Sequence, residues 1–376
     1  MRILVDRKTL SEAVNLAARV TAKKRDVSIL QNVHFEVKNN EVTLTATDAE
    51  TTLRTSIALH VMKGDGQFCV SAKELKAMLA GASGETVALE ATEDGCFTLE
   101  YSNGVFICPA TGADEFPETK QEEMTERVQL PGLLIRDALK RSLWSVSDDE
   151  LRIALMGVCF TLRRPGILDI VTTNAQVLVL SRIRLSYSTG SEFRFIIPKK
   201  AAMLLQRVLS DEPVDLSWND QSCRVKVGPY TFDIRNIDAR FPDYDKVIPN
   251  AIPLQALVPR DTVLRSLKRL LPFSDDKFGR VNLSFSNGTL KMSADDFENM
   301  RGARQTIAIA HESDDAKICV SGRRLAGILS KLSGQDAVFG ITDAPGTPVI
   351  VWPWSQAADC EVTMLMTSMR GNKHDE

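Results

Sequence analysis

The chain has 376 residues, 44% of them hydrophobic and 25% charged, and a formal net charge of −3. This length predicts two or three globular domains. No apolar run approaches the roughly 18 residues of a membrane-spanning helix, and the opening "MRILVD" carries charge too early for a secretory signal, so we expect a cytoplasmic protein. The slightly negative charge does not exclude nucleic-acid binding, because the distribution of charge decides that property.

The first third of the chain alternates helical and strand patterns. A helix is predicted over 6–21, a strand–turn–strand over 33–48 ("VHFEVKNNEVTLTATD") and a second helix over 71–83. The stretch "ADEFPETKQE" (113–122) then interrupts the periodicity with a Phe-Pro pair. The predicted order in this third is therefore helix, strands, helix and strands, and the Phe-Pro stretch marks the end of the unit.

The second third repeats the same order. A helix is predicted from Pro131, a hairpin over 158–174 ("VCFTLRRPGILDIVTTN") and a helix over 198–210. A second Phe-Pro stretch, "ARFPDYDKVIPN" (239–250), follows where the first third has its own.

The last third has the helix from Pro259, the hairpin over 281–296 ("VNLSFSNGTLKMSADD") and the helix over 321–333. The hairpins start at Val33, Val158 and Val281, which are 125 and 123 residues apart. Four elements in one order, three times over, predict an internal repeat. We therefore expect an α+β fold of three similar domains, with boundaries at 1–124, 125–251 and 252–376.

Three such units in line form a curved array with an unpaired strand at each end. Exposed strand edges promote association, and a symmetric oligomer that joins end to end removes them by closing into a ring. The two Phe-Pro stretches then mark the exits of the first two units.

Basic residues gather on the polar sides of the predicted helices. If these helices share one side of the array, they form a surface that attracts phosphate backbones without reading sequence. Helices poor in Tyr and Phe favour duplex over single-stranded nucleic acid. The alternative is that each helix simply has an ordinary solvated face. The candidate DNA-binding residues are Lys23, Lys24, Arg25, Arg152, Lys199, Lys200, Arg207, Arg265, Lys268 and Arg269.

No pattern of catalytic or metal-binding residues stands out. The four histidines are scattered, and "HESDD" (311–315) lacks the second His of a zinc motif. The seven cysteines have no C-x-x-C spacing, so we expect buried reduced thiols and neither a disulfide framework nor a zinc site. A nucleic-acid-processing enzyme stays open as an alternative, without a motif to support it. We expect no cofactor and no metal.

The threefold repeat, "TLTATDAE" (43–50), "DEFP" and "RFPDYDKVIP" resemble the β sliding clamps of bacterial replicative DNA polymerase. The resemblance runs from Met1 to about Thr367. It implies three similar domains per subunit and two subunits joined head to tail into a ring, with helices lining the hole and sheets outside. It also implies a processivity factor without catalysis, which a clamp loader places on duplex DNA and which tethers the replicative polymerase and other partners.

The resemblance further implies a groove that binds short apolar peptides of partner proteins. The positions that match the groove are Leu155, Thr172, Val177, Pro242, Lys246, Val247 and Met364. Plain core packing is the alternative for each apolar member.

The chain departs from the family beside this groove. The family run Thr-Asp-Gly-His-Arg-Leu reads "TTNAQV" (172–177) here, and the C-terminal segment lacks the usual proline. A specialised or mobile-element clamp with other partners is therefore an alternative, as is a clamp-like interaction module.

For subunit contact, the resemblance points to Phe106 and Ile107 on an edge strand of the first unit. Leu271 and Phe273, at the end of the helix that starts at Pro259, match the other side of the contact. Large apolar side chains at a seam are typical anchors of a homodimer.

Overall fold

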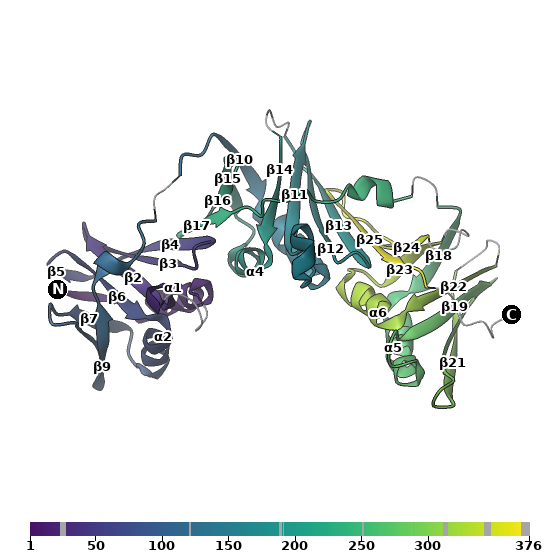
Figure 1. Ribbon diagram of the computed structural model, residues 1–376, viewed down its shortest axis with the longest axis horizontal. Coiled ribbons are helices and arrows are strands. Elements are labelled where there is room, and N and C mark those ends of the chain that lie inside the picture. The colour runs from purple at the N-terminus through teal and green to yellow at the C-terminus, as the bar shows by residue number, and fades with distance from the viewer. Residues whose placement is uncertain are drawn as a thin grey trace. The chain divides into compact units, whose positions relative to one another are not determined.

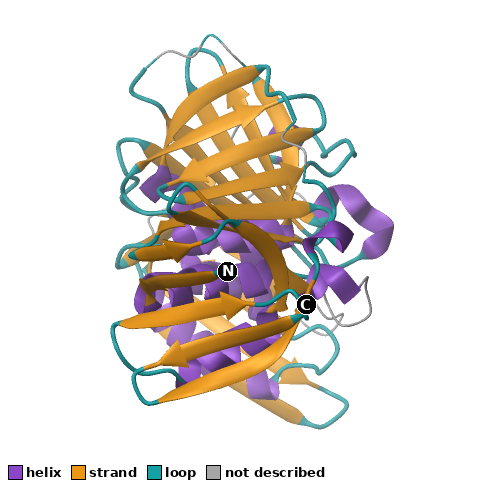
Figure 2. Cartoon of the chain, turned by 90° about the vertical axis from the view of Figure 1, so that its left-hand side faces the viewer, coloured by secondary structure: helices purple, strands orange, loops and turns teal. Residues whose placement is uncertain are grey.

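The structure is a computed structural model of an α+β chain in which strands predominate (Figure 2). It divides into two compact units, Met1–Arg136 with Lys200–Asn236, and Asp137–Lys199 with Ile237–Glu376. The residues that the structure describes are 1–22, 28–119, 122–187, 190, 192–249, 252–286, 288–310, 315–341 and 347–369.

The first unit is built on one antiparallel sheet. Within the described residues this sheet has 13 strands, in the order β10-β15-β16-β17-β4-β3-β2-β6-β9-β8-β7-β1-β5. Helices α1 (Arg7–Val20) and α2 (Ala72–Gly81) pack against each other, and α1 also contacts strands β3 and β4 (Figure 1). The strands are β1 (Arg2–Asp6), β2 (Asn32–Lys38), β3 (Glu41–Thr47), β4 (Thr51–Ala58), β5 (Val61–Lys63), β6 (Gly66–Ser71), β7 (Thr86–Ala91), β8 (Cys96–Tyr101), β9 (Gly104–Thr111), β10 (Glu126–Pro131), β15 (Pro213–Trp218), β16 (Ser222–Val227) and β17 (Tyr230–Arg235).

The second unit holds two sheets. Their strand orders over the described residues are β14-β11-β12-β13-β25-β24-β23-β18 and β21-β20-β19-β22. Helices α5 (Arg260–Leu270) and α6 (Gly322–Lys331) pack together, while α3 (Gly132–Ser142) and α4 (Lys199–Val208) run from one unit into the other. The strands are β11 (Gly157–Arg163), β12 (Ile167–Thr173), β13 (Val177–Arg184), β14 (Phe193–Pro198), β18 (Leu254–Pro259), β19 (Arg280–Ser286), β20 (Thr289–Asp296), β21 (Arg301–Ala308), β22 (Ala316–Ser321), β23 (Asp336–Ile341), β24 (Pro348–Pro353) and β25 (Cys360–Thr367).

The element order confirms the repeat. In the described chain a strand, a helix, a group of strands, a second helix and three strands follow one another three times. The six helices begin and end close to the predicted positions, and the three predicted hairpins are β2–β3, β11–β12 and β19–β20. Sequence reasoning missed the strand that opens each repeat (β1, β10 and β18), which pairs with the first strand after the second helix.

Local chemistry explains where the elements start and turn. Asp6 caps α1 by accepting a hydrogen bond from the Thr9 N–H at 2.7 Å. A shared turn follows the second hairpin strand of each repeat: the side chains of Asp48, Asn174 and Asp296 each accept a hydrogen bond from the backbone N–H three residues ahead. The three residues therefore occupy equivalent positions, and the equivalence aligns the repeats residue by residue.

Strand pairing joins one repeat to the next. In the first unit β4 of the first repeat pairs with β17, the last strand of the second repeat. In the second unit β13 of the second repeat pairs with β25, the last strand of the third. The two equivalent strands that have no such partner from another repeat are β9 and β21. Among the described residues, β9 pairs over 104–109 with β8 alone, and β21 pairs with β20 alone.

The segments that leave the first and second repeats are bound to the sheets. In the first connector (residues 112–119 and 122–125) Phe116 stacks on His34 with ring centroids 5.1 Å apart, and the Thr119 carbonyl accepts from Arg54 at 2.5 Å. In the second connector (residues 237–249) Phe241 and Tyr244 are buried. The Phe-Pro stretches thus lie on the sheets as the chain passes from one repeat to the next.

The contact between α6 and the segment that follows α3 can be tested at Gly327 of α6. A Cβ at Gly327 would lie 2.8 Å from the Trp144 ring, closer than side chains tolerate. Alanine gains about 1 kcal/mol of helix propensity, but overpacking costs about 1–3 kcal/mol. We therefore expect Gly327→Ala to lower the free energy of unfolding by up to about 2 kcal/mol, measured by urea denaturation. Trp144→Phe removes the clashing ring atoms, so adding Gly327→Ala to that variant should stabilise it; a loss in both backgrounds would contradict the explanation.

Candidate functional site

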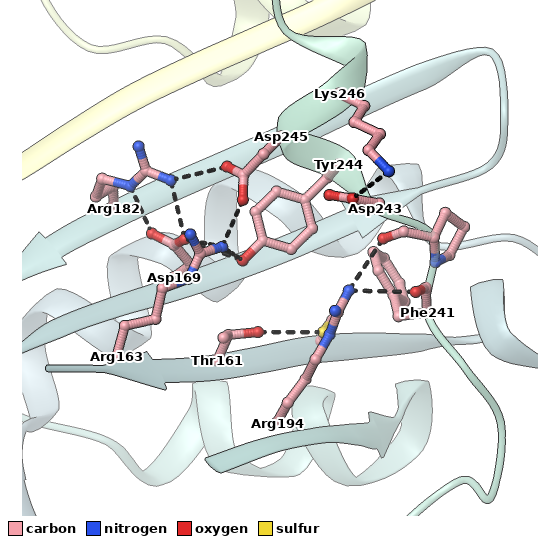
Figure 3. Close-up of polar contacts among 12 residues, drawn as sticks. Thr161, Arg163, Asp169, Arg182, Arg194, Phe241, Asp243, Tyr244, Asp245 and Lys246 are labelled. Atoms are coloured by element: carbon pink, nitrogen blue, oxygen red, sulfur yellow. Dashed lines mark hydrogen bonds and ion pairs between the residues drawn. The ribbon is translucent and has the colours of Figure 1, made fainter. Parts of the chain in front are cut away.

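A buried carboxylate anchors the second connector to the sheet of the second unit (Figure 3). Asp169 on β12 has no exposed surface and lies directly opposite Arg182 on β13. Arg182 donates to both Asp169 oxygens, from Nε at 2.8 Å and from Nη2 at 3.0 Å. Arg163 on β11 adds an ion pair at 3.2 Å. Asp169 is therefore held by two guanidinium groups, as a buried charge must be.

The connector supplies the remaining partners of this network. The Tyr244 hydroxyl donates to Asp169 Oδ2 at 2.9 Å, and Asp245 pairs with Arg163 at 2.8 Å and with Arg182 at 3.2 Å. Burial raises the pKa of Tyr244 to about 12, so the phenol keeps its proton and donates. The hydrogen bonds to Asp169 raise the pKa of Arg182. We call these five residues, Arg163, Asp169, Arg182, Tyr244 and Asp245, the connector network.

Apolar contacts hold the connector on the same face of the sheet. Phe241 and Tyr244 pack in a buried cluster with Leu155, Leu178 and Leu365. Arg194 on β14 lies over the Tyr244 ring, 5.6 Å from its centroid, and donates to the carbonyls of Phe241 and Pro242 at 3.2 and 3.0 Å. This packing fixes the backbone of the connector and presents the Pro242 side chain to solvent.

The residues predicted for the peptide groove divide into exposed and buried groups. Pro242, Lys246 and Val247 on the connector are exposed, with Val247 45% exposed. The other four are at most 6% exposed. Solvent therefore reaches the three connector residues, while neighbouring side chains cover the rest. The four buried residues are Leu155, Thr172, Val177 and Met364.

Strand register separates the four buried residues further, onto two faces of the sheet. Thr172 pairs with Val179, and Val179 pairs with Met364, so these side chains share one face. Val177 lies two residues before Val179 and points the same way. Leu155 packs with the connector on the opposite face. Thr172 also shares a 2.6 Å hydrogen bond with Ser145, between the two hydroxyls, which places it against the residues that follow α3.

Residues 172–177, which differ from the family sequence, form a turn held by side-chain hydrogen bonds. Asn174 Oδ1 accepts from the N–H groups of Gln176 and Val177 at 3.1 and 2.9 Å, and Ala175 has φ +68°. The Gln176 side chain accepts a hydrogen bond from Arg324 of α6. The turn is thus built without the glycine of the family run, and it is tied to α6.

The candidate DNA-binding residues differ in what they contact. Arg207 on α4 and Arg265, Lys268 and Arg269 on α5 are exposed. Lys23, Lys24 and Arg25 lie outside the described residues.

Three other candidates already have acidic partners. Lys199 pairs with Asp148 at 2.7 Å, and Arg152 pairs with Asp149 at 3.4 Å. Lys200 donates to Asp48 at 2.6 Å and to the carbonyls of Val20 and Thr21 at 2.6 and 3.3 Å. These contacts engage all three ammonium protons of Lys200, so it ties α4 to the end of α1. Helix α4 contains no acid of its own, and the acids that pair with its two lysines come from elsewhere in the chain.

Two of the residues expected at a subunit contact lie on the open edge of β9, and the other two follow α5. On β9, Ile107 is 64% exposed and Phe106 stacks on Tyr101 with centroids 5.1 Å apart. Beyond α5, Phe273 is 41% exposed and Leu271 is half-buried in a short 3-10 helix (Leu271–Phe273). Sequence reasoning missed Val105, which is 51% exposed on the same strand as Ile107.

The connector network was also missed, although one signal was present. Asp169 interrupts the apolar run "GILDIVTT" (166–173), and an acid inside a buried strand requires cationic partners. The identity of those partners depends on strand pairing and on a connector 75 residues further along the chain.

Other site types find no support in the part of the chain that the structure describes. No group of three or more His, Cys, Asp or Glu side chains gathers there as a metal site would require, and no described helix combines the length and hydropathy needed to cross a membrane. The seven cysteines are free thiols, and six of them are buried as predicted, whereas Cys96 is partly exposed.

Comparison with known proteins identifies relatives along most of the chain. The family model of the DNA polymerase III beta subunit, N-terminal domain, matches residues 1–120, and that of the central domain matches 129–243. The beta sliding clamp of Pseudomonas aeruginosa is 20% identical over 352 residues, covering 93% of this chain and 95% of that protein. The clamp of Synechococcus elongatus is 23% identical over 362 residues, covering 94% and 96%.

Solved structures agree with these matches. The griselimycin-bound sliding clamp of P. aeruginosa superimposes with a TM-score of 0.92 at 20% identity, covering 99% of this chain and all of that one. The clamp of Bartonella birtlesii, also bound to griselimycin, gives 0.91 at 25% identity with the same coverage. The fold is therefore shared along nearly the whole chain, although the sequences have diverged widely.

Proposed function

This chain belongs to the family of DNA polymerase III beta subunits, the beta sliding clamps, and we propose from that membership that it is a DNA sliding clamp, a ring that encircles duplex DNA and holds a polymerase on its template. Tethering raises the effective concentration of polymerase at the DNA, which needs no chemistry by the clamp itself. We propose a non-catalytic protein whose partners are duplex DNA, a replicative polymerase and a clamp loader.

The observation that carries the ring proposal is the pair of free strand edges. Two of the three equivalent strand pairs, β4 with β17 and β13 with β25, form within the chain. The third would pair β21 of one chain with β9 of another, because these are the equivalent strands left over. Val105, Ile107 and Phe273 supply exposed apolar surface near these edges. Two chains joined head to tail in this way close a ring of six repeats.

We expect Ile107→Asp to dissociate the proposed homodimer. A carboxylate placed in an apolar seam without a partner costs about 3–5 kcal/mol, so the dissociation constant should rise at least a hundredfold. Light scattering on a size-exclusion column measures the result as a fall from twice 41.6 kDa to the mass of one chain.

The control is Val61→Asp, which adds the same charge at a 44%-exposed apolar residue of another end strand, β5. It should leave the mass unchanged. A wild-type chain that is monomeric at micromolar concentration would refute the closed ring.

The DNA surface is proposed for the exposed cations of α4 and α5. Arg207, Arg265, Lys268 and Arg269 are presented on helices with few acids, which suits contacts with phosphates that do not depend on base sequence. Such contacts permit sliding, because every register along the duplex is equivalent.

The experiment that tests the function is retention on DNA of defined topology. The chain is loaded onto nicked circular DNA with the clamp loader of its host cell and ATP, and the circle is then linearised. A ring stays on the circle and slides off the linear product, whereas a protein that binds one side of DNA stays on both. Equal retention on the two forms would refute the sliding clamp.

Partner proteins are proposed to bind at the second connector, where Pro242, Lys246 and Val247 face solvent. An apolar peptide would pack against Pro242 and Val247, with the connector network holding the backbone beneath them.

A further inference from the structure

A polar pocket opens between the second connector and the edge of the sheet beneath it. Its volume is about 460 Å³, and its lining includes Thr161 and Arg163 on β11, Arg194 on β14, and Arg240 and Pro242 on the connector. Pro242 also belongs to the exposed part of the proposed peptide groove. The pocket therefore continues the surface on which a partner peptide would lie.

The charges around this pocket are unbalanced. The two carboxylates in its lining are engaged by other cations: Asp243 pairs with Lys246 at 3.2 Å, and Asp245 pairs with Arg163 and Arg182. Arg194 bonds to main-chain carbonyls, and neither it nor Arg240 forms an ion pair with a carboxylate of the described chain. Two guanidinium groups thus meet at one pocket without a counter-ion.

Arg163 and Arg194 are held in place before any ligand arrives. Arg163 and Arg194 both lie over the Tyr244 ring, at 5.4 and 5.6 Å from its centroid. Arg194 is fixed further by the carbonyls of Phe241 and Pro242. Donors ordered in this way lose little conformational entropy when they bind an anion.

We propose that this pocket binds the carboxylate of an acidic residue in the partner peptide, next to the apolar residues that pack on Pro242 and Val247. The inference rests on the proposed function of the connector surface. A peptide carboxylate is favoured over a free phosphate because Pro242 lines both surfaces, so one extended segment reaches both. Charge-assisted bonds to Arg240 and Arg194 then set a preference for acidic over neutral partner peptides.

The test compares peptides that differ in one charge. Fluorescein-labelled nine-residue peptides carry a Leu-Phe pair, with Glu or Gln at each of three positions on either side, and anisotropy measures their binding to the full chain. At one position Glu should bind about five- to tenfold more tightly than Gln at low salt, and the ratio should shrink as salt rises. Arg240→Ala should lower the ratio, because Arg194 remains as the one cation free of a carboxylate, and should leave the affinity of the Gln peptide unchanged; Arg240→Glu should invert the preference.

The control is Arg164→Ala, an exposed arginine beyond the end of β11 that does not line the pocket; it should keep the full Glu preference. No Glu preference at any position, or one that survives both Arg240 substitutions, would overturn the pocket while leaving the groove in place. Failure of all the peptides to bind would refute the groove and the pocket together. Displacement of the Glu peptide by inorganic phosphate at equal concentration would assign the pocket to phosphate instead.

Discussion

Alanine at Arg265, Lys268 and Arg269 together is expected to weaken duplex binding several hundredfold. The three side chains are exposed on α5, and the acid on that helix, Asp261, is paired with Arg260 at 2.8 Å. Each phosphate contact contributes about 0.9 to the slope of log affinity against log salt. Losing three contacts makes that slope shallower by about 2.7, which at about 0.1 M salt is a loss of roughly 500-fold for each chain that contacts the duplex. Anisotropy of a labelled duplex over a salt series measures the slope and the affinity.

The control removes the same charge from the sheets of the same repeat. Lys277, Lys291 and Lys317 are exposed on strands or loops of the third repeat, and their triple alanine variant has the same net charge as the α5 variant. The salt slope of this control should match that of the wild type. Equal losses in both variants would show that net charge decides binding, and would refute a DNA surface on α5.

Asp169→Asn is expected to lower the free energy of unfolding by about 3–5 kcal/mol. The substitution keeps the shape of the side chain but removes the charge that neutralises Arg163 and Arg182, and it turns an amide N–H toward donors. Breaking a buried ion pair by removing one partner has a cost of this size. Because the chain has two compact units, the urea transition should be followed by Trp fluorescence and by hydrogen exchange along residues 237–249.

Asp243→Asn is the matched control. It makes the same change on the same connector, but Asp243 is 52% exposed and pairs only with the exposed Lys246 among the described residues. A surface ion pair of this kind contributes about 0–1 kcal/mol. If the two variants lose the same stability, the connector network does not hold the connector. If Asp169→Asn alone accelerates exchange at Phe241 and Tyr244, the network positions the peptide surface as well as stabilising it.

The helices show how much local pattern predicts. Asp6 and Ser71 precede helices that begin at the next residue, and the side chain of each accepts a hydrogen bond from a backbone N–H of the first turn. The strands that open the repeats were missed because they are short, five or six residues, and run directly into a helix. A short alternating stretch becomes a strand only when a partner edge is available, and that edge lies far away in sequence.

The candidate sites show where local pattern fails. Arg207 and Lys200 lie on one helix, yet only Arg207 is exposed, because Asp48 and the carbonyls at the end of α1 bind Lys200. Likewise Thr172 and Leu155 were assigned to one groove, but strand register turns Thr172 away from the buried cluster in which Leu155 packs. Sequence position identifies a residue with a family role, but the pairing of strands decides which face it occupies.

The sequence by itself determined the threefold repeat, the helices and hairpins within it, and the family. These properties follow from periodicities of 3.6 and 2 residues and from turn chemistry, which neighbouring residues carry. Only the tertiary structure decided that β4 joins β17, that β13 joins β25, that β9 and β21 remain open, and that Asp169 anchors the second connector. Those outcomes depend on backbone pairing and on buried charges between residues that are 13 to 189 positions apart in the chain. A pattern of neighbouring residues cannot predict contacts over such separations.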